Sequence, residues 1–321
     1  MLAETIESVL NQRNVDLEVI VIDDCSTDGT EEFVKGLNDE RIRYIRNEKN
    51  SGLEYNRNSG LRNARGKYIT WIDDDDYYTD YDFFSKAIKI FEENDSEDKP
   101  LAVVCANSFV LDIKSGKKKP HIAGRPGRVD GLDFALNSNG KYGKPSSTFP
   151  AVYKADALRQ AGLNDLMIFD SITSSEAALF GDAWYMPDKI GVYRIGHSRM
   201  TIGRCKEDTD YDRRHYEIMH ENIRRWRVLR DKLEINHRSE ANKLYLRTMT
   251  GLVMYYAKAR PSLKDRRKVL AIIRQESGKG FMSKLWAAYV WALFKRQLIK
   301  ITPLRRVYRK IKYGDSHYGE Y

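Results

Sequence analysis

Hydrophobic residues follow two alternating patterns along the first half of the chain. Runs such as 17–23 (Leu-Glu-Val-Ile-Val-Ile-Asp) are almost continuously apolar, as expected of strands that a parallel sheet buries on both faces. Between these runs, apolar positions such as Ile6, Val9 and Leu10 recur at helical spacing. The predicted strands cover residues 17–23, 41–46, 67–73, 101–111 and 183–195, and the predicted helices cover residues 2–12, 30–37, 52–64, 81–93 and 155–161. Strands and helices that alternate with short links predict an α/β fold with an open sheet.

Two regions depart from this alternation. Residues 114–150 are rich in Gly, Lys, Pro, Ser and Asn, which predicts a long loop region with little regular structure. From about residue 208 the pattern is helical to the end of the chain, with breaks at proline and glycine residues. We therefore expect a first domain over residues 1–205 and a basic helical C-terminal region over residues 206–321.

Charge divides the chain at about the same place. The formal net charge is +9, but residues 201–321 carry 29 Lys and Arg against 13 Asp and Glu, whereas the first 200 residues have a net charge of −7. Three widely spaced cysteines predict neither a disulfide framework nor a zinc site, and they fit a reducing compartment. The longest apolar run, 285–294, is far shorter than the roughly 20 residues of a membrane-spanning helix, and residues 1–12 lack a signal-peptide pattern. We expect a protein of the cytoplasm or of the inner face of the cell membrane.

The acidic run Asp73–Asp76 is the strongest sign of chemistry in the sequence. It follows a predicted strand, and four neighbouring carboxylates repel one another unless a cation lies among them. Hard divalent cations prefer oxygen ligands and often bridge carboxylates to substrate phosphates. Ligands of open α/β sheets bind at the carboxyl ends of strands, where Asp23 and Asp24 also lie. A metal–phosphate site is one interpretation, and a solvated acidic loop that caps the next helix is the other.

A series of short motifs occurs in a fixed order around this run. They are Ile-Glu-Ser-Val-Leu-Asn-Gln at 6–12, Val-Ile-Asp-Asp-Cys-Ser-Thr-Asp-Gly-Thr at 21–30, Asn-Ser-Gly at 50–52, Asn-Arg-Asn-Ser-Gly at 56–60, Ala-Arg-Gly-Lys-Tyr-Ile-Thr-Trp-Ile-Asp-Asp-Asp-Asp at 64–76, Phe-Asp at 169–170 and Tyr-Arg-Ile-Gly-His at 193–197. Together they resemble the GT-A glycosyltransferases of family 2, a large inverting family, from Thr5 to about Thr201. The resemblance implies a GT-A-type open mixed sheet flanked by helices, and a nucleoside-diphosphate sugar as the donor.

The resemblance assigns roles at the donor site to five residues. Asp24 matches the acid that accepts a hydrogen bond from the nucleotide base, and Arg57 matches a basic residue near the nucleotide. Asp75 matches the main ligand of a divalent metal, Mn²⁺ or Mg²⁺, with Asp73 as a second ligand beside the nucleotide sugar. Asp74 matches a ribose contact, although a shift of one residue within the acidic run stays open. The plain alternatives are a turn acid for Asp24 and a surface arginine for Arg57.

Two further assignments come from the later motifs. Asp170 matches the general base that removes a proton from the acceptor hydroxyl, and apolar neighbours would raise its proton affinity. Many relatives have Glu before this Asp, where this chain has Phe169, so Glu176 is a second candidate and a helix-capping role for Asp170 stays open. Arg194 and His197 match a basic pair that touches the diphosphate from the side opposite the metal, although a loop histidine is often merely solvated.

The start of the chain departs from the family pattern. Family members normally open with a buried strand of the type Val-Ser-Val-Ile-Ile-Pro-x-Tyr-Asn, whereas this chain starts inside the helix that follows it. We expect the sheet to lack this strand, which leaves strand 17–23 without one neighbour.

The C-terminal region suggests a membrane surface. Residues 281–312 contain nine Lys and Arg, no acid, and several aromatic residues, a composition that fits an interfacial helix on an anionic bilayer. The alternative is a helix that packs on the catalytic domain with a solvated basic face. No recognition motif accompanies the charge, so nucleic acid is not an expected partner.

The sequence therefore predicts a metal-dependent inverting glycosyltransferase. It would move a sugar from a nucleoside-diphosphate donor, with UDP favoured, to a hydroxyl of a glycan, a lipid-linked glycan or a cell-surface polymer. Acceptor choice is expected to lie in residues 114–150 and the C-terminal helices. The alternative is a catalytically impaired relative that binds nucleotide sugar, or that acts as a membrane-surface interaction protein.

Overall fold

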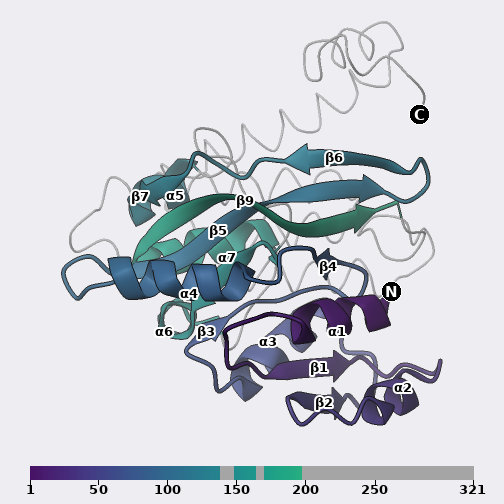
Figure 1. Ribbon diagram of the computed structural model, residues 1–321. Helices are drawn as coiled ribbons and strands as arrows, with labels where there is room; N and C mark the ends of the chain where they lie inside the picture. The colour runs from purple at the N-terminus through teal and green to yellow at the C-terminus, as the bar shows by residue number, and fades with distance from the viewer. Residues whose placement is uncertain (138–147, 164–169, 197–321) are drawn as a thin grey trace, which may run out of the picture. The chain divides into compact units, whose positions relative to one another are not determined.

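The computed structural model describes residues 1–137, 148–163 and 170–196 (Figure 1). All of them belong to one unit, Met1–Thr201. The helices are α1 (Leu2–Leu10), α2 (Thr30–Gly36), α3 (Leu53–Asn63), α4 (Phe83–Asn94), α5 (Gly131–Asn137), α6 (Ala155–Gln160) and α7 (Asp170–Ala177), followed by a 3₁₀ turn, Ala178–Phe180. The strands are β1 (Val19–Asp23), β2 (Ile42–Arg46), β3 (Tyr68–Ile69), β4 (Tyr77–Tyr78), β5 (Leu101–Asp112), β6 (Lys117–His121), β7 (Gly127–Val129), β8 (Ala151–Lys154) and β9 (Asp182–Ile195).

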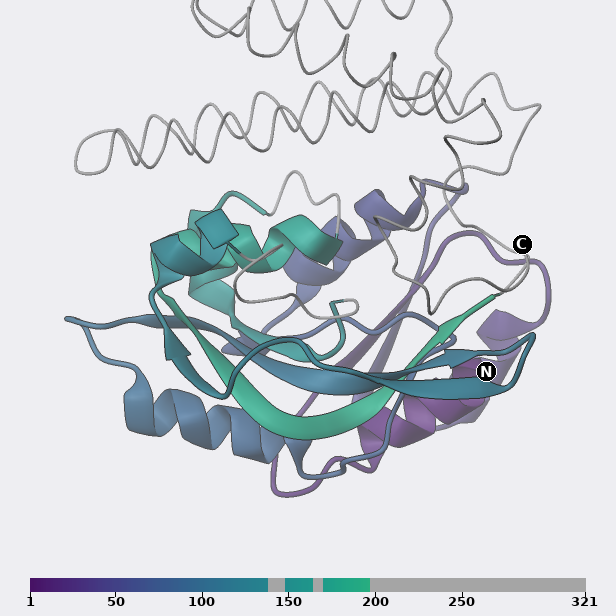
Figure 2. The same cartoon turned by 90° about the horizontal axis from the view of Figure 1, so that it is seen from above.

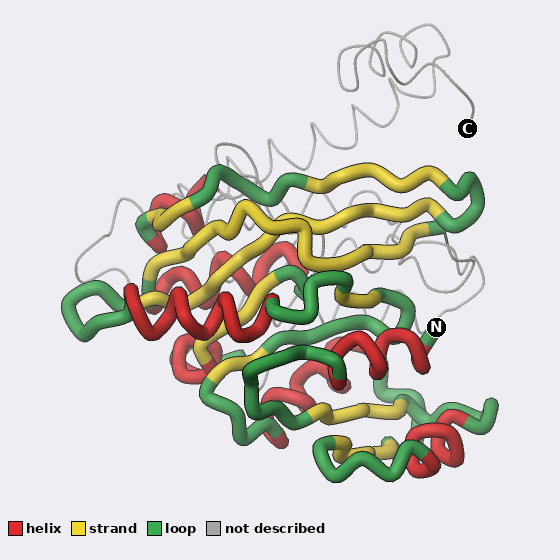
Figure 3. Tube along the Cα trace, viewed as in Figure 1, coloured by secondary structure: helices red, strands yellow, loops and turns green. Residues whose placement is uncertain are grey.

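A mixed, seven-stranded sheet forms the centre of this unit. Its order is β3-β8-β5-β9-β4, with β6 added to β5 and β7 added to β9. The long strands β5 and β9 run parallel, side by side from Leu101 and Asp182 to Asp112 and Ile195 (Figure 3). The other pairs in this sheet are antiparallel. The predicted open mixed sheet is confirmed.

The strands β1 and β2 form a second, parallel sheet of their own, with Val19 opposite Ile42 and Asp23 opposite Arg46. Among the described strands, β1 has β2 as its single neighbour. Both strands end at the same edge, which places Asp23, Asp24 and the segment after Arg46 together.

Helices cover both faces of the large sheet (Figure 2). Successive residues of a strand point to opposite faces, so Val103 and Cys105 of β5 pack in one core cluster while Val104 and Ala106 pack in another. The first cluster includes buried side chains from α3, α6 and α7, and the second includes buried side chains from α1 and α4. The result is a three-layer α/β/α arrangement, as the alternating pattern predicts.

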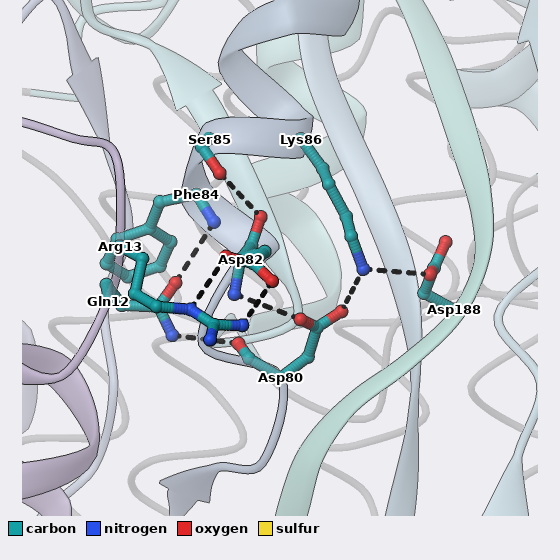
Figure 4. Close-up of polar contacts among 8 residues, drawn as sticks. All are labelled: Gln12, Arg13, Asp80, Asp82, Phe84, Ser85, Lys86 and Asp188. Carbon is teal, nitrogen blue, oxygen red and sulfur yellow. Dashed lines mark hydrogen bonds and ion pairs between the residues drawn. The ribbon is translucent and has the colours of Figure 1, made fainter.

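A polar junction fixes the end of α1 against the start of α4 (Figure 4). The buried Gln12 donates from Nε2 to the carbonyl oxygen of Asp80 (2.9 Å) and accepts the backbone N–H of Phe84 at Oε1 (3.1 Å). Arg13 pairs with Asp82, and Lys86 bridges Asp80 and Asp188 of β9. These contacts attach the segment between β4 and α4 to the residues after α1, to α4 itself and to β9.

Two predicted elements are wrong. The strand expected at 67–73 is limited to Tyr68–Ile69, because its pairing with β8 ends at Ile69 and the chain then turns through the acidic run. The loop expected at 114–150 instead contains β6, β7 and α5. The strand β6 was missed because Lys117–His121 forms an exposed sheet edge with hardly any apolar residue, so it shows no hydrophobic alternation.

The domain boundary at 205 and the helical region 206–321 lie outside the described residues, so both stay predictions. None of the helices in the described ranges combines the length and hydropathy of a segment that crosses a bilayer.

Candidate active site

The acidic run forms a tight turn between β3 and β4. The backbone N–H of Asp76 donates to the carbonyl oxygen of Asp73 (3.2 Å). The buried Thr5 of α1 places its hydroxyl 2.6 Å from the carbonyl oxygen of Asp76 and 3.0 Å from that of Asp74. One helix side chain therefore holds the backbone of the turn, while the carboxylates of Asp73, Asp74 and Asp75 stay partly or fully exposed.

The fourth carboxylate of the turn, Asp76, is completely buried. Its Oδ1 accepts the backbone N–H of Arg194 (2.8 Å), and its Oδ2 has no hydrogen-bond partner among the described residues. Burial raises the pKa of Asp76 to about 8, and the neighbouring charges of Asp73 and Asp75 act in the same direction. Asp76 thus joins the turn to β9, whereas the other three carboxylates face outward.

Arg57 of α3 lies against the start of the turn. Its guanidinium, which is almost fully buried, contacts Asp73 with 3.1 Å between Nη2 and Oδ1. The indole N–H of Trp71 approaches the carbonyl oxygen of Arg57 (3.4 Å). These contacts bring together two residues that the sequence assigns to the donor site, and the cation offsets part of the repulsion within the acidic turn.

Arg194 of β9 lies against the end of the turn. Its Nη1 donates to the carbonyl oxygen of Asp75 (2.5 Å), and its Nη2 donates to Glu4 of α1 (2.5 Å). The guanidinium also lies 4.3 Å from the ring centroid of Tyr77. The structure therefore joins Arg194 to the acidic turn across more than a hundred residues of chain.

Asp24 lies in a separate nest of donors at the end of β1. Its carboxylate accepts hydrogen bonds from the backbone N–H groups of Ser51 (2.7 Å) and Gly52 (2.8 Å) and from the side chain of Asn47 (2.8 Å). Asn47 also donates to Asn56 (2.7 Å), which precedes Arg57 on α3. A continuous polar network therefore runs from Asp24 to the residue beside Arg57, and Asp24 orders the loop that leads into α3.

The neighbouring Asp23 shapes the turn that presents Asp24. Burial alone would raise the pKa of Asp23, but hydrogen bonds from Ser26 and Tyr44, together with the charge of Arg46, outweigh burial and lower this pKa. Asp23 therefore stays ionised and fixes the chain direction after β1.

The predicted base, Asp170, is the first residue of α7, and its side chain lies outside the described part of the chain. The helix packs on β8: the hydroxyl groups of Tyr153 and Ser174 are 2.8 Å apart, and Tyr153 contacts Trp71 edge-on, with 5.5 Å between ring centroids. Glu176, the second candidate base, is buried. His197 lies outside the described residues, so its role stays a prediction.

Thr5, Glu4 and Tyr77 support the turn but were not singled out in the sequence. Thr5 had a usable signal, because it is a polar residue beside Ile6 and Val9 on the buried side of α1. Glu4 and Tyr77 carried none, since their contacts depend on the side-chain position of Arg194.

The residues of the turn fit a divalent cation. In the described ranges, no three His, Cys, Asp or Glu side chains converge as they would around a fully protein-bound ion. Mg²⁺ is commonly held by one or two carboxylates and completed by water and substrate phosphates, and Mn²⁺ favours the same oxygen ligands. Asp73 and Asp75 supply two such carboxylates from one turn, next to Arg57 and Arg194.

Comparisons with known proteins concern the fold and the first part of the chain. A solved structure, S. aureus TarS 1–349, has the same fold, with a TM-score of 0.59 and 16% sequence identity over 97% of this chain and 88% of that one. The architecture is that of the GT-A glycosyltransferases. Residues 1–145 match the family model "Glycosyl transferase family 2", which bears out the resemblance of this part of the chain to that family.

Curated relatives match over segments of very different length. "Putative colanic acid biosynthesis glycosyl transferase WcaA" of Escherichia coli is 49% identical over 76 residues, which are 23% of this chain and 27% of that protein. "Putative teichuronic acid biosynthesis glycosyltransferase TuaG" of Bacillus subtilis is likewise matched over 30% of its length. "GalNAc(5)-diNAcBac-PP-undecaprenol beta-1,3-glucosyltransferase" of Campylobacter jejuni is 26% identical over 84% of this chain and 82% of its own.

Proposed function

We propose that this protein is an inverting glycosyltransferase that moves a sugar from a nucleoside-diphosphate donor to a hydroxyl of a lipid-linked glycan or a growing polysaccharide. The observation that carries the proposal is the acidic turn Asp73–Asp76, set between Arg57 and Arg194 inside the family 2 region. Opposite charges arranged in this way suit a metal-bound diphosphate, whose negative charge grows as the glycosidic bond to the donor breaks.

Different acidic residues bind different parts of the donor. Asp75 and Asp73 hold a divalent cation, Mn²⁺ or Mg²⁺, which when bound offsets the charge of the leaving diphosphate. Asp74, the most exposed of the four, contacts the ribose. Asp24 lies at the end of β1, where its carboxylate accepts one further hydrogen bond, from the nucleotide base.

The acceptor end depends on Asp170. Inversion needs one carboxylate that takes the proton from the acceptor hydroxyl as its oxygen attacks the anomeric carbon, opposite the leaving diphosphate. The helix α7, which Asp170 begins, suits this role because Ser174 within it contacts Tyr153, and Tyr153 contacts Trp71, two residues before the acidic turn. Arg194, with His197 nearby in the chain, supports the diphosphate from the side of β9.

The names of the relatives favour particular substrate classes. The C. jejuni relative is named for an acceptor linked to undecaprenol through a diphosphate. A shorter match in Escherichia coli, 40% identical over 74 residues, is named "UDP-Glc:alpha-D-GlcNAc-diphosphoundecaprenol beta-1,3-glucosyltransferase WfaP". We therefore propose a UDP-sugar as donor and a polyprenyl-diphosphate-linked glycan as acceptor for this chain.

Calorimetry with UDP and Mn²⁺ tests the donor site. The wild-type protein should bind UDP at least tenfold more tightly with Mn²⁺ than with EDTA, about 1.4 kcal/mol. The variant Asp75→Ala should lose this difference, while Asp98→Ala, which removes an exposed carboxylate between α4 and β5, should keep it. Metal-independent binding, or equal behaviour of the two variants, would overturn the metal assignment.

A panel of UDP-sugars then separates an enzyme from a binding protein. Donor hydrolysis or transfer that is lost in Asp170→Asn, with UDP binding unchanged, supports the proposed base. Nucleotide-sugar binding without any hydrolysis or transfer would instead favour the catalytically impaired relative.

A further inference from the structure

A basic hairpin extends from the acidic turn's side of the large sheet. It follows the end of β5 at Asp112, consists of the turn, the edge strand β6 and Ile122, and is defined here as residues 113–122 (Figure 1). Its four lysines are all exposed: Lys114, Lys117, Lys118 and Lys119. From Ile113 to Val129 the chain has six Lys and Arg and no Asp or Glu, although the first 200 residues have an excess of acids.

Lys117, Lys118 and Lys119 of the basic hairpin form no ion pair with a carboxylate in the described part of the chain, whereas the charge of Lys114 helps to lower the pKa of Asp112. Most other cations of this unit form ion pairs, as Lys35, Lys86 and Lys154 do. Lys118 instead lies over the ring of Phe109, 4.5 Å from the ring centroid. The hairpin therefore presents a net positive charge to its surroundings, even with Asp112 beside it.

Exposed isoleucines accompany this charge. Ile122 is 56% exposed, Ile113 is 41% exposed, and Ile195 at the end of β9 is 39% exposed. The backbone N–H of Ile113 donates to the carbonyl oxygen of Ile195 (3.0 Å), so two of the three lie together where the hairpin leaves the sheet. Apolar side chains among lysines are the composition that binds the interface of an anionic bilayer.

The basic hairpin begins beside the candidate active site. Leu111, two residues before Ile113, pairs with Arg194, and Arg194 contacts the carbonyl oxygen of Asp75. A binding partner that contacts the hairpin would thus lie close to the edge of the sheet that carries the acidic turn.

We propose that the basic hairpin docks this protein on an anionic phospholipid surface. Headgroup phosphates contact the lysines, and the isoleucines enter the interfacial layer. The docking itself does not require catalysis. Its consequence, that a lipid-linked acceptor is presented to the acidic turn, rests on the proposed function. Edge strands also carry lysines simply to prevent pairing with other sheets, but that purpose does not call for exposed isoleucines beside them.

Vesicle partitioning tests the proposal on the full chain. The hairpin variant replaces Lys117, Lys118 and Lys119 with Gln. The control variant replaces Lys67, Lys89 and Lys99 with Gln, which removes the same charge from exposed positions before β3, within α4 and before β5. Both variants keep residues 281–312, so any contribution of the C-terminal region is the same in each.

Partitioning onto phosphatidylcholine vesicles that contain phosphatidylglycerol should fall at least about tenfold in the hairpin variant and by much less in the control. Binding should also weaken with salt and be absent on phosphatidylcholine alone. Equal losses in the two variants, or no loss in the hairpin variant, would overturn the proposal. The edge-protection alternative predicts self-association of the hairpin variant, visible by light scattering, with vesicle binding unchanged.

A label tests the same contact with all lysines in place. An environment-sensitive dye on Ser115→Cys, with Cys25 and Cys205 replaced by Ser, should shift to the blue when phosphatidylglycerol vesicles are added. An unchanged spectrum on vesicles that do bind the protein would contradict the proposal. Hydrolysis of a UDP-sugar in solution should be the same in the hairpin variant and the wild type. Absence of that hydrolysis in both would count against the proposed function alone.

Discussion

The buried carboxyl group of Asp76 makes a quantitative prediction about stability. Its side chain is fully buried, and its pKa is raised from 3.8 to about 8 in the folded protein. A carboxyl group whose folded pKa is raised favours folding most when it is protonated in both states. Its contribution is complete below pH 3.8 and is lost as the pH rises through the folded pKa. The substitution Asp76→Asn keeps the shape of the side chain and removes its ionisation.

The magnitude follows from the size of the shift. Each pH unit between about 4 and 8 costs the wild type about 1.4 kcal/mol relative to the variant. At pH 7 the ionisation penalty is about 4 kcal/mol, and between pH 5 and pH 7 the stability difference should change by about 3 kcal/mol in favour of Asp76→Asn. The decisive quantity is the change with pH of the difference in unfolding free energy between the variant and the wild type, because this change depends on one proton. The size of the difference at any single pH also contains the altered contact with the backbone N–H of Arg194.

Urea unfolding followed by tryptophan fluorescence at pH 5, 6 and 7 measures this slope. EDTA should be present throughout, because a cation held by the neighbouring carboxylates would favour the charged form of Asp76. Titrations common to both proteins cancel in the difference. The exposed control Asp98→Asn should give a difference that is flat with pH. A flat difference for Asp76→Asn as well would refute the account of a buried, neutral carboxyl group beneath the turn.

Three further predictions concern the frame around the site. Gly191→Ala should destabilise the protein by at least about 2 kcal/mol in urea unfolding, because a Cβ there would lie 2.5 Å from the carbonyl oxygen of Tyr77; a change below about 0.5 kcal/mol would argue against the β4–β9 pairing. Gln12→Ala should cost about 2 kcal/mol, since it leaves the backbone N–H of Phe84 without a partner and removes one of the two hydrogen bonds to the carbonyl oxygen of Asp80; a neutral effect would contradict the junction in Figure 4. Iodoacetamide at pH 8 should modify Cys25 and spare Cys105 until unfolding, because burial raises the pKa of the Cys105 thiol to about 12; peptide mapping by mass spectrometry would reveal the reverse.

The sequence predicts those helices and strands whose apolar residues are buried in the core. The strand expected at 101–111 is β5, Leu101–Asp112, because its apolar run is buried on both faces. The short strand β3 and the edge strand β6 were misjudged for the opposite reason. Their extents are set by pairing with β8 and β5, and hydrophobic pattern carries no information about such pairing when the side chains face solvent or a turn.

The candidate site also has features that the sequence could predict and features that it could not. The residue types of the acidic turn could be recognised from the sequence, because four adjacent carboxylates at a strand end are a local feature. The difference between Asp76 and its three neighbours could not, since burial depends on Thr5 and Arg194 from distant parts of the chain. The positions of Arg57 and Arg194 on the two ends of the turn are also products of the fold.

The most direct test of the account is the position of the metal. A crystal of this protein grown with UDP and Mn²⁺ should show an anomalous peak at the acidic turn, about 2 Å from a carboxylate oxygen of Asp75 and in contact with both phosphates of UDP. A diphosphate bound elsewhere on the sheet, or bound at the turn with no ion between it and Asp75, would contradict the central claim.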